Sequence, residues 1–161
     1  MKVIFLDIDG VLNVYPQGHD KHGALFHSHF VENLKRIIDE TGAKIVISST
    51  WRMAGLPGMI EMWSDRKLPG EVIGVTPNFM FRTGTTLQRG KEIDAWIEEW
   101  ESNNSKLESY VIIDDDSDME PHQLENFILT AGNTNHTDYV DGGGYGLTKE
   151  CTEWAIRILN R

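Results

Sequence analysis

The sequence is poor in cysteine and in basic residues, and it lacks any long hydrophobic run. Its single cysteine, Cys151, excludes an intrachain disulfide and a cysteine-rich zinc site, and it is typical of a reducing cytoplasm. No apolar run reaches the length of a membrane span, and the N-terminal segment becomes acidic too soon for a signal peptide. We therefore expect a cytoplasmic protein with no membrane partner.

Basic residues are outnumbered, with 15 Lys and Arg against 25 Asp and Glu and a formal net charge of −10. This balance disfavours broad, sequence-independent binding to phosphate backbones, but it leaves room for a small local basic patch. The length of 161 residues fits a single domain, residues 1–161, with one main site. The sequence leaves the oligomeric state open.

Short apolar runs alternate with helical patterns along the chain. Runs at residues 3–6, 45–47 and 111–113 predict strands buried on both faces, and weaker candidates lie at 72–75 and 137–140. Helical spacing of apolar residues follows a possible cap at Ser28 and ends at Gly42, and it recurs from Arg89 and after Thr148. Less regular helices are predicted at 57–66 and 121–129. The alternation predicts an α/β fold with a doubly wound parallel sheet.

Polar residues follow the three best strands. Asp7 and Asp9 follow the first, Ser48 and Ser49 the second, and an acidic run from Asp114 follows the third. Ligands of open α/β sheets bind outside the carboxyl ends of the strands, so these side chains are expected to converge. Converging carboxylates repel unless a cation lies among them, and oxygen ligands favour Mg²⁺ over zinc.

A phosphoryl pocket would also need a cation and a hydroxyl. Arg89 or Lys91, at the start of a predicted helix, supplies the cation, and the second strand supplies the hydroxyl. The sequence thus predicts a site for a phosphorylated substrate.

Four segments resemble the motifs of the haloacid dehalogenase-like (HAD) hydrolases, most of which are phosphatases with an aspartate nucleophile. They are "FLDIDGV", "KIVIS", "RGKEIDAWI" and "VIIDDDSD", in the order that the superfamily shows. Together with "SSTWR" they resemble the short, cap-poor branch that includes the phosphatase domains of RNA repair proteins. The resemblance covers nearly the whole chain and implies a HAD-like, Rossmannoid fold with a minimal cap or none.

The resemblance implies a role for each matching residue. Asp7 would attack phosphorus and form an aspartyl-phosphate, and Asp9 would protonate the leaving oxygen and later activate water. Mg²⁺ would take a carboxylate oxygen of Asp7, the backbone carbonyl of Asp9 and a carboxylate of Asp114. Ser48 would donate to a phosphoryl oxygen, and Arg89 would neutralise the intermediate.

Two assignments stay open at this stage. Arg89 and Lys91 compete as the phosphate-neutralising cation, and Arg89 is preferred because it opens the helix. Asp115 and Asp118 compete as the acid that supports the metal beside Asp114, with Asp115 taken as the metal ligand.

Further residues fit the edges of the predicted pocket. Gly10 suits a sharp turn beside the ligand, and Ser49, Lys91 and Arg52 are predicted to contact substrate. Four histidines, His19, His22, His27 and His29, predict a solvated flap after the first strand, since their spacing matches no closed zinc site.

The leading interpretation is therefore a Mg²⁺-dependent phosphomonoester phosphatase. The resemblance to repair-associated domains implies a nucleic-acid 3′-phosphate end as the substrate, which the small predicted cap would allow, and a small molecule such as a nucleotide is the alternative. The alternative is a non-catalytic module that binds a phosphorylated ligand or a protein partner. The presence of both Asp7 and Asp9 argues against that alternative, because binding alone needs no nucleophile and acid together.

Overall fold

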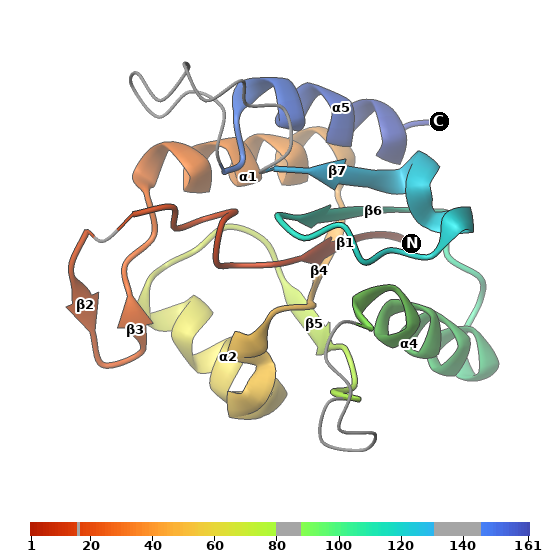
Figure 1. Cartoon of the computed structure of the whole chain (residues 1–161), viewed down its shortest axis with the longest axis horizontal. Helices are drawn as coiled ribbons and strands as arrows, with labels where there is room; N and C mark the ends of the chain where they lie inside the picture. Colours follow the sequence, from red (N-terminus) through yellow and green to blue (C-terminus); the bar gives the residue numbers. More distant parts are fainter. Residues whose placement is uncertain (16, 80–87, 131–145) are drawn as a thin grey trace.

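A five-stranded parallel sheet forms the centre of the chain in the computed structural model, which describes residues 1–15, 17–79, 88–130 and 146–161. The strand order is β5-β4-β1-β6-β7, and all four pairings are parallel (Figure 1). The strands are β1 (Lys2–Leu6), β4 (Lys44–Ile47), β5 (Val72–Val75), β6 (Ser109–Asp114) and β7 (Phe127–Leu129). The predicted α/β doubly wound sheet is confirmed.

The described residues also form four α-helices and two 3₁₀ helices, which lie between or after these strands along the chain. The α-helices are α1 (Ser28–Thr41), α2 (Gly55–Asp65), α4 (Arg89–Asn103) and α5 (Lys149–Leu159), and the 3₁₀ helices are η1 (Thr50–Ala54) and η2 (Pro121–Asn126). A small hairpin, β2 (His19–Asp20) and β3 (Gly23–Ala24), follows β1. Each helix in the described ranges is too short or too polar to cross a membrane.

The sheet is buried on both faces, which explains its continuous apolar runs. Ile4 and Leu6 of β1 belong to a core that includes apolar residues of α1, α2 and α5. Val3 and Phe5 point the other way and pack with α4, where the rings of Phe5 and Trp96 lie 5.4 Å apart, edge to face. The alternation of side chains along a strand thus fills two separate cores.

The direction of winding changes between β1 and β6. From β1 the chain moves outward through β4 to β5, and after α4 it resumes on the other side of β1 with β6 and then β7. A doubly wound sheet binds ligands at this switch point, outside the carboxyl ends of the strands. The fold therefore directs attention to the residues that end β1 and β6.

The predicted helix at 121–129 is wrong. The segment forms the short 3₁₀ helix η2 and then strand β7, which pairs with β6. A capping box between Glu120 and Gln123 and a proline at Pro121 favour a helical start, but the apolar residues after Asn126 complete the edge of the sheet instead. Pairing with a neighbouring strand has overridden the local pattern.

Other boundaries differ little from the prediction. The N-cap of α1 is His27 rather than Ser28, and Gly42 ends the helix with φ of 69°. Thr148 caps α5 by accepting a hydrogen bond from the Cys151 amide, as predicted. The strand predicted at 137–140 lies outside the described residues.

Residues 17–27, called the flap below, contain the β2–β3 hairpin and lie against α2. The Arg66 guanidinium donates to both carboxylate oxygens of Asp20, at 2.9 and 2.6 Å, and to the carbonyls of Gly23 and Ala24. It also lies 4.6 Å from the ring centroid of Phe26. One nearly buried cation thus makes several of the contacts that hold the flap, and no large cap is present in the part of the chain that the structure describes.

We predict that Arg66→Gln releases the flap, because glutamine cannot reproduce these four hydrogen bonds. Backbone amides of residues 17–27 should exchange with deuterium several-fold faster, while those of β1 and β6 stay protected. Arg36→Gln is the matched control, since Arg36 also binds carboxylates, those of Glu40 in α1 and of Glu153 in α5, but away from the flap. Equal rates of amide exchange in residues 17–27 of both variants would contradict the role of Arg66 in holding the flap.

Candidate active site

The ends of β4, β1 and β6 bring three polar side chains to one level. Leu6 is in register with Ile47 and Ile113, so the residues that follow them, Asp7, Ser48 and Asp114, lie side by side. The Asp7 amide donates to the Ile113 carbonyl at 3.0 Å, which extends the pairing by one residue. The side chains of Asp7 and Asp114 are 6 and 0 % exposed.

Three carboxylates gather at this point. One oxygen from each of Asp7, Asp114 and Asp115 lies within 4.8 Å of the others. Burial, and then the neighbouring negative charge, raises the pKa of Asp7 and of Asp114, although Arg89 opposes this. The Asp114 Oδ2 atom is buried and accepts no hydrogen bond within the described ranges. A hard divalent cation fits this group, because it would neutralise the charges and complete that oxygen's bonding.

Gly10 allows Asp115 to approach the other two acids. Its φ is +79°, and a Cβ atom at this position would lie 2.2 Å from Asp115 Oδ2. The Thr130 hydroxyl, which follows β7, donates to the Gly10 carbonyl at 3.0 Å and fixes the turn. The structure thus places Gly10 against a candidate metal ligand.

Arg89 is the cation beside the carboxylates. Its Nη1 atom lies 3.6 Å from Asp7 Oδ1, and its Nε atom lies 3.5 Å from Asp114 Oδ2. Nη1 is buried and donates no hydrogen bond to any described residue. Lys91 is exposed, two positions along α4. The geometry favours Arg89 over Lys91 as the group that would meet a phosphoryl oxygen.

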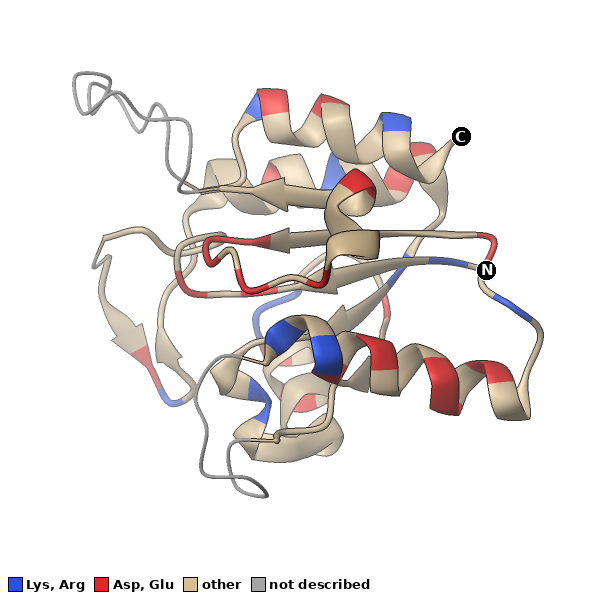
Figure 2. Cartoon of the chain, turned by 45° about the vertical axis from the view of Figure 1, so that its right-hand side comes forward, with Lys and Arg blue, Asp and Glu red and all other residues tan. Residues whose placement is uncertain are grey.

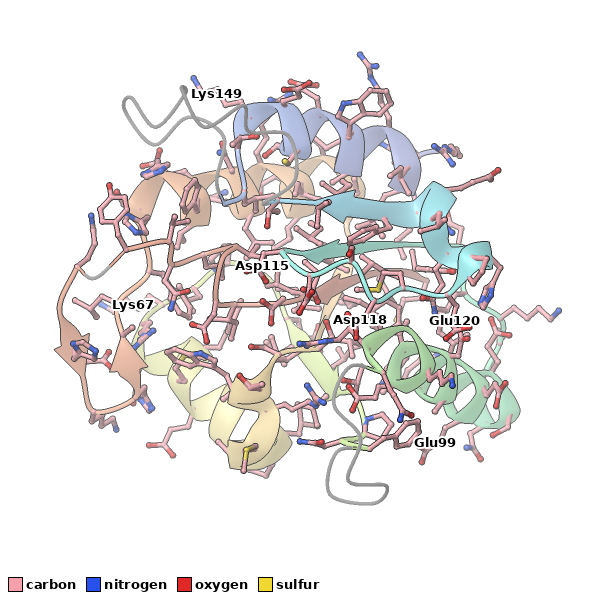
Figure 3. The ribbon with its side chains drawn as sticks, in the orientation of Figure 1. Lys67, Glu99, Asp115, Asp118, Glu120 and Lys149 are labelled. Carbon is pink, nitrogen blue, oxygen red and sulfur yellow. The ribbon has the colours of Figure 1, made fainter. Side chains whose placement is uncertain are left out.

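Asp118 lies beside the helix that carries Arg89 and is absent from the three-carboxylate group. Its Oδ2 atom accepts a hydrogen bond from the Arg89 amide at 2.9 Å, at the first residue of α4. Figure 3 labels Asp115 after β6 and Asp118 by the first turn of α4. Asp115 is therefore the acid placed to support a metal, whereas Asp118 caps the helix.

Ser48 and Ser49 are both fully buried, but their contacts differ. A hydrogen bond from the Ser49 hydroxyl lowers the pKa of Asp7, and Ser49 also caps η1 by accepting from the Trp51 amide. The Ser48 hydroxyl is buried without a hydrogen-bond partner in the described segments. Ser48 is thus the donor left for a ligand, and Ser49 positions Asp7.

Thr76 is a similar residue that the sequence reasoning missed. It follows β5, its amide donates to the Ile47 carbonyl, and its buried hydroxyl has no partner in the described part of the chain. The same rule, a hydroxyl directly after a strand, would have found it at the weaker run 72–75.

Arg52, predicted to contact substrate, lies in a buried ion pair. Its Nη2 atom is 2.6 Å from Glu92 Oε2, and its Nη1 atom donates to the Ser49 carbonyl at 2.8 Å. Both side chains of the pair are less than a tenth exposed. The pair joins η1 to α4, so Arg52 holds two walls of the site together.

Asp9 is exposed at the mouth of the site. Its Oδ1 atom accepts from the Asn13 amide at 2.8 Å, and its Oδ2 atom accepts from the Trp51 indole N–H at 3.0 Å. Trp51 is not among the residues that the sequence analysis predicts to contact substrate. The hydrogen bond to Asp9 is a new observation.

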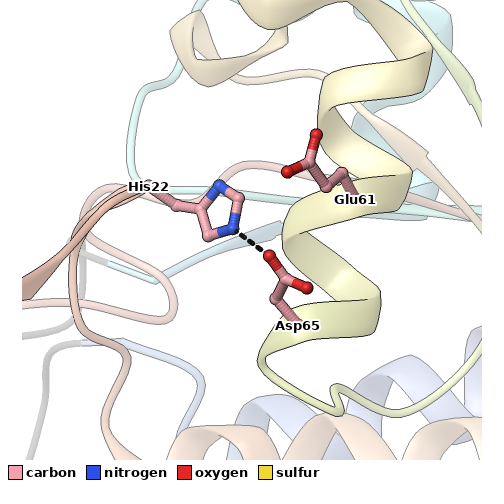
Figure 4. Close-up of side chains that lie close together, drawn as sticks. All are labelled: His22, Glu61 and Asp65. Carbon is pink, nitrogen blue, oxygen red and sulfur yellow. Dashed lines mark hydrogen bonds and ion pairs between the residues drawn. The ribbon is translucent and has the colours of Figure 1, made fainter.

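A second group of possible ligands lies between the flap and α2. The ligand atoms of His22, Glu61 and Asp65 lie within 4.8 Å of one another (Figure 4). The Lys21 ammonium already lies 3.1 Å from Glu61 and 2.8 Å from Asp65. The cluster forms an ion-pair network that fastens the flap to α2.

The flap is less solvated than its histidines predict. His19 is exposed, whereas His27 is 1 % exposed, and its ring packs on Tyr15 and Phe30. Because His27 also caps α1, it belongs to the framework of the protein.

Charge is distributed unevenly along α4. Figure 2 shows basic residues at the start of α4 and acidic residues along the rest of it, and Glu92 already lies in the first turn. The basic pair is Arg89 and Lys91, and the acidic residues are Glu92, Asp94, Glu98, Glu99 and Glu101. Positive charge thus faces the carboxyl end of the sheet, although the whole chain is acidic.

Comparison with protein families gives one match, to the family described as the HAD domain in Swiss Army Knife RNA repair proteins, over residues 3–138. Comparison with curated proteins and with solved structures gives no match. The matched range contains every carboxylate and cation of the site described above.

We predict that Gly10→Ala weakens both folding and metal binding, because the new Cβ would displace Asp115. Gly42→Ala is the control, since Gly42 has φ of +69° and open space within 4 Å of the position that a Cβ atom would take. The control should lose about 1 kcal/mol of stability and keep its Mg²⁺ affinity. Urea unfolding and Mg²⁺ calorimetry measure both effects. Equal Mg²⁺ affinities in the two variants would contradict the role given to Gly10.

We also predict opposite pH dependence with and without Mg²⁺. The pKa values of Asp7 and Asp114 are raised from 3.8 in the folded protein, so the stability they contribute without metal is present in acid and lost as the pH rises into the neutral range. In EDTA, the melting temperature of the wild type should fall more between about pH 5 and pH 8 than that of Asp114→Asn. Protons compete with Mg²⁺, so Mg²⁺ should stabilise the wild type more at about pH 8. An identical slope for both proteins in EDTA would contradict this.

Proposed function

The chain belongs to the HAD domains of Swiss Army Knife RNA repair proteins, and from this and the site geometry we propose that it is a Mg²⁺-dependent phosphomonoester hydrolase. One observation carries the proposal. The buried carboxylate of Asp7 lies 3.6 Å from the Arg89 guanidinium and within 4.8 Å of the carboxylates of Asp114 and Asp115. A proposed nucleophile, a cation and carboxylates that could hold a metal thus meet at the carboxyl ends of β1 and β6.

The reaction has two displacements at phosphorus. A carboxylate oxygen of Asp7 attacks phosphorus, the bond from phosphorus to the ester oxygen breaks, and Asp9 gives that oxygen a proton. Water then attacks the phosphorus of the aspartyl-phosphate, Asp9 takes the proton of the water, and the Asp7 carboxylate is released with inorganic phosphate. Bound Mg²⁺ would balance the negative charge of the carboxylates and the phosphoryl oxygens.

The donors proposed for the phosphoryl group are two buried groups near Asp7 that hold no internal hydrogen bond in the described residues. They are Ser48 Oγ, directly after the neighbouring strand β4, and Arg89 Nη1, at the first residue of α4. Such donors gain most when charge builds up on the phosphoryl oxygens, so they stabilise the transition state. We expect both donors to contact the phosphoryl group. Asp118 would hold the backbone of Arg89 in place, and Ser49 would hold the carboxylate of Asp7.

For the substrate, we propose the phosphorylated 3′ end of a polynucleotide. The family name refers to RNA repair proteins, and an open site suits a bulky substrate better than a small one. A net charge of −10 disfavours long contacts with a phosphate backbone, so binding would be limited to the terminal phosphate and its nearest neighbours. We place this activity in a single cytoplasmic domain, residues 1–161.

We predict Mg²⁺-dependent release of phosphate that fails in two variants. Asp7→Asn removes the nucleophile, and Arg89→Gln should lower kcat/KM by about 10²-fold or more through lost charge stabilisation. Asp116→Asn and Lys91→Gln are the controls, since both residues are exposed neighbours in the same segments. The controls should stay within about threefold of the wild type.

The assay compares an aryl phosphate, oligonucleotides with a 3′- or a 5′-phosphate, and free nucleotides, each in Mg²⁺ and in EDTA. Preference for the 3′-phosphorylated oligonucleotide would support the proposed substrate, and preference for nucleotides would replace it. If the wild type binds Mg²⁺ but turns over none of these, the protein is a binding module and the proposal fails.

A further inference from the structure

Trp51 connects the acid of the site to the flap. Its indole N–H donates to Asp9 Oδ2 at 3.0 Å, and its ring centroid lies 5.6 Å from that of Phe26 in the flap. The Arg66 guanidinium lies 5.7 Å from the centroid of the Trp51 ring. The side chain thus has a polar contact at one end and an aromatic contact along its body.

The flap leaves little free space at the ring. A Cβ atom on Gly23 would lie 3.1 Å from Trp51 Cη2, so the backbone of the hairpin approaches the indole closely. Arg66 fixes that part of the hairpin through the Gly23 carbonyl and the Asp20 carboxylate. The flap therefore restricts the orientation of the indole ring, and Arg66, directly after α2, holds the flap in position.

The two partners of Asp9 differ in what they can do. The Asn13 side chain can donate or accept, depending on which way its amide faces, whereas an indole N–H can only donate. The bond from Trp51 therefore requires Oδ2 to accept, and together with the Asn13 amide on Oδ1 it fixes the plane of the carboxyl group. A carboxyl group that must protonate a leaving oxygen needs this kind of fixed orientation.

We propose that Trp51 is a positioning residue for Asp9. Its hydrogen bond orients the Asp9 carboxyl group toward the leaving oxygen, and this orientation depends on the flap being packed against the indole ring. This inference rests on the proposed phosphatase function, since it assigns Asp9 as the acid. Packing alone would not require tryptophan, because phenylalanine could also contact Phe26. The N–H group is the specific element.

The test exploits substrates that differ in their need for an acid. The leaving group of phenyl phosphate is a basic phenolate, which needs a proton as it departs. The leaving group of 2,4-dinitrophenyl phosphate is a stable anion, which does not. Trp51→Phe should lower kcat/KM for phenyl phosphate by about tenfold or more and change that for 2,4-dinitrophenyl phosphate by less than about threefold. The value of kcat/KM is used because it includes the departure of the leaving group.

Trp63→Phe is the matched control. The Trp63 indole also donates one hydrogen bond, to the Pro69 carbonyl at 2.8 Å, but from within α2 and away from Asp9. This variant should affect both substrates equally, if at all. In an Asp9→Asn background, Trp51→Phe should cause no further loss on phenyl phosphate, because its effect passes through Asp9.

Equal loss on both substrates, or no loss, would overturn the role of Trp51. If Trp51→Phe fails to fold, a benzothiophene analogue of tryptophan placed at position 51 removes the N–H and keeps the shape of the ring, with the same expected result. Failure of the proposed function is distinguishable, because the wild type would then hydrolyse neither phosphate.

Discussion

The main constraint on this structure is the repulsion between buried carboxylates at the carboxyl ends of β1 and β6. Asp7 and Asp114 follow adjacent central strands, and parallel register brings their carboxylates together whether or not they attract. Burial raises the pKa of both groups, so the isolated arrangement is unfavourable at neutral pH. Arg89 offsets part of this cost, and a bound cation would offset the rest. The site therefore has carboxylate charge that a metal ion would balance and a guanidinium N–H that a phosphoryl oxygen would accept from.

Much of the surrounding structure serves to hold that arrangement. Asp118 caps the helix that brings Arg89 to the carboxylates, and the Arg52–Glu92 pair joins η1 to the same helix. Gly10 gives Asp115 the space to approach from the side. These contacts come from four different segments, so the site is rigid where the charges meet. Its mouth is different, because Asp9 is exposed there and is held by hydrogen bonds from Asn13 and Trp51.

The sequence predicted the parts that follow from local pattern and strand order. Apolar runs identified four of the five strands, and the polar residues after them met as the rule for open sheets requires. It failed where long-range contacts decide. Strand β7 has only three residues and forms because β6 offers an edge, and Arg52 is buried by Glu92, forty positions away. Likewise, the bond from Trp51 to Asp9 joins two segments that only the folded chain brings together.

The central claim is that Asp7 becomes phosphorylated during turnover. Rapid acid quench of the enzyme with substrate and Mg²⁺, followed by digestion and mass spectrometry, tests it directly. The account predicts one added phosphoryl group on the peptide that contains Asp7, removed by hydroxylamine as expected for an acyl phosphate. Phosphate release at full rate from an enzyme that carries no phosphoryl group, or carries it on another residue, would contradict the account.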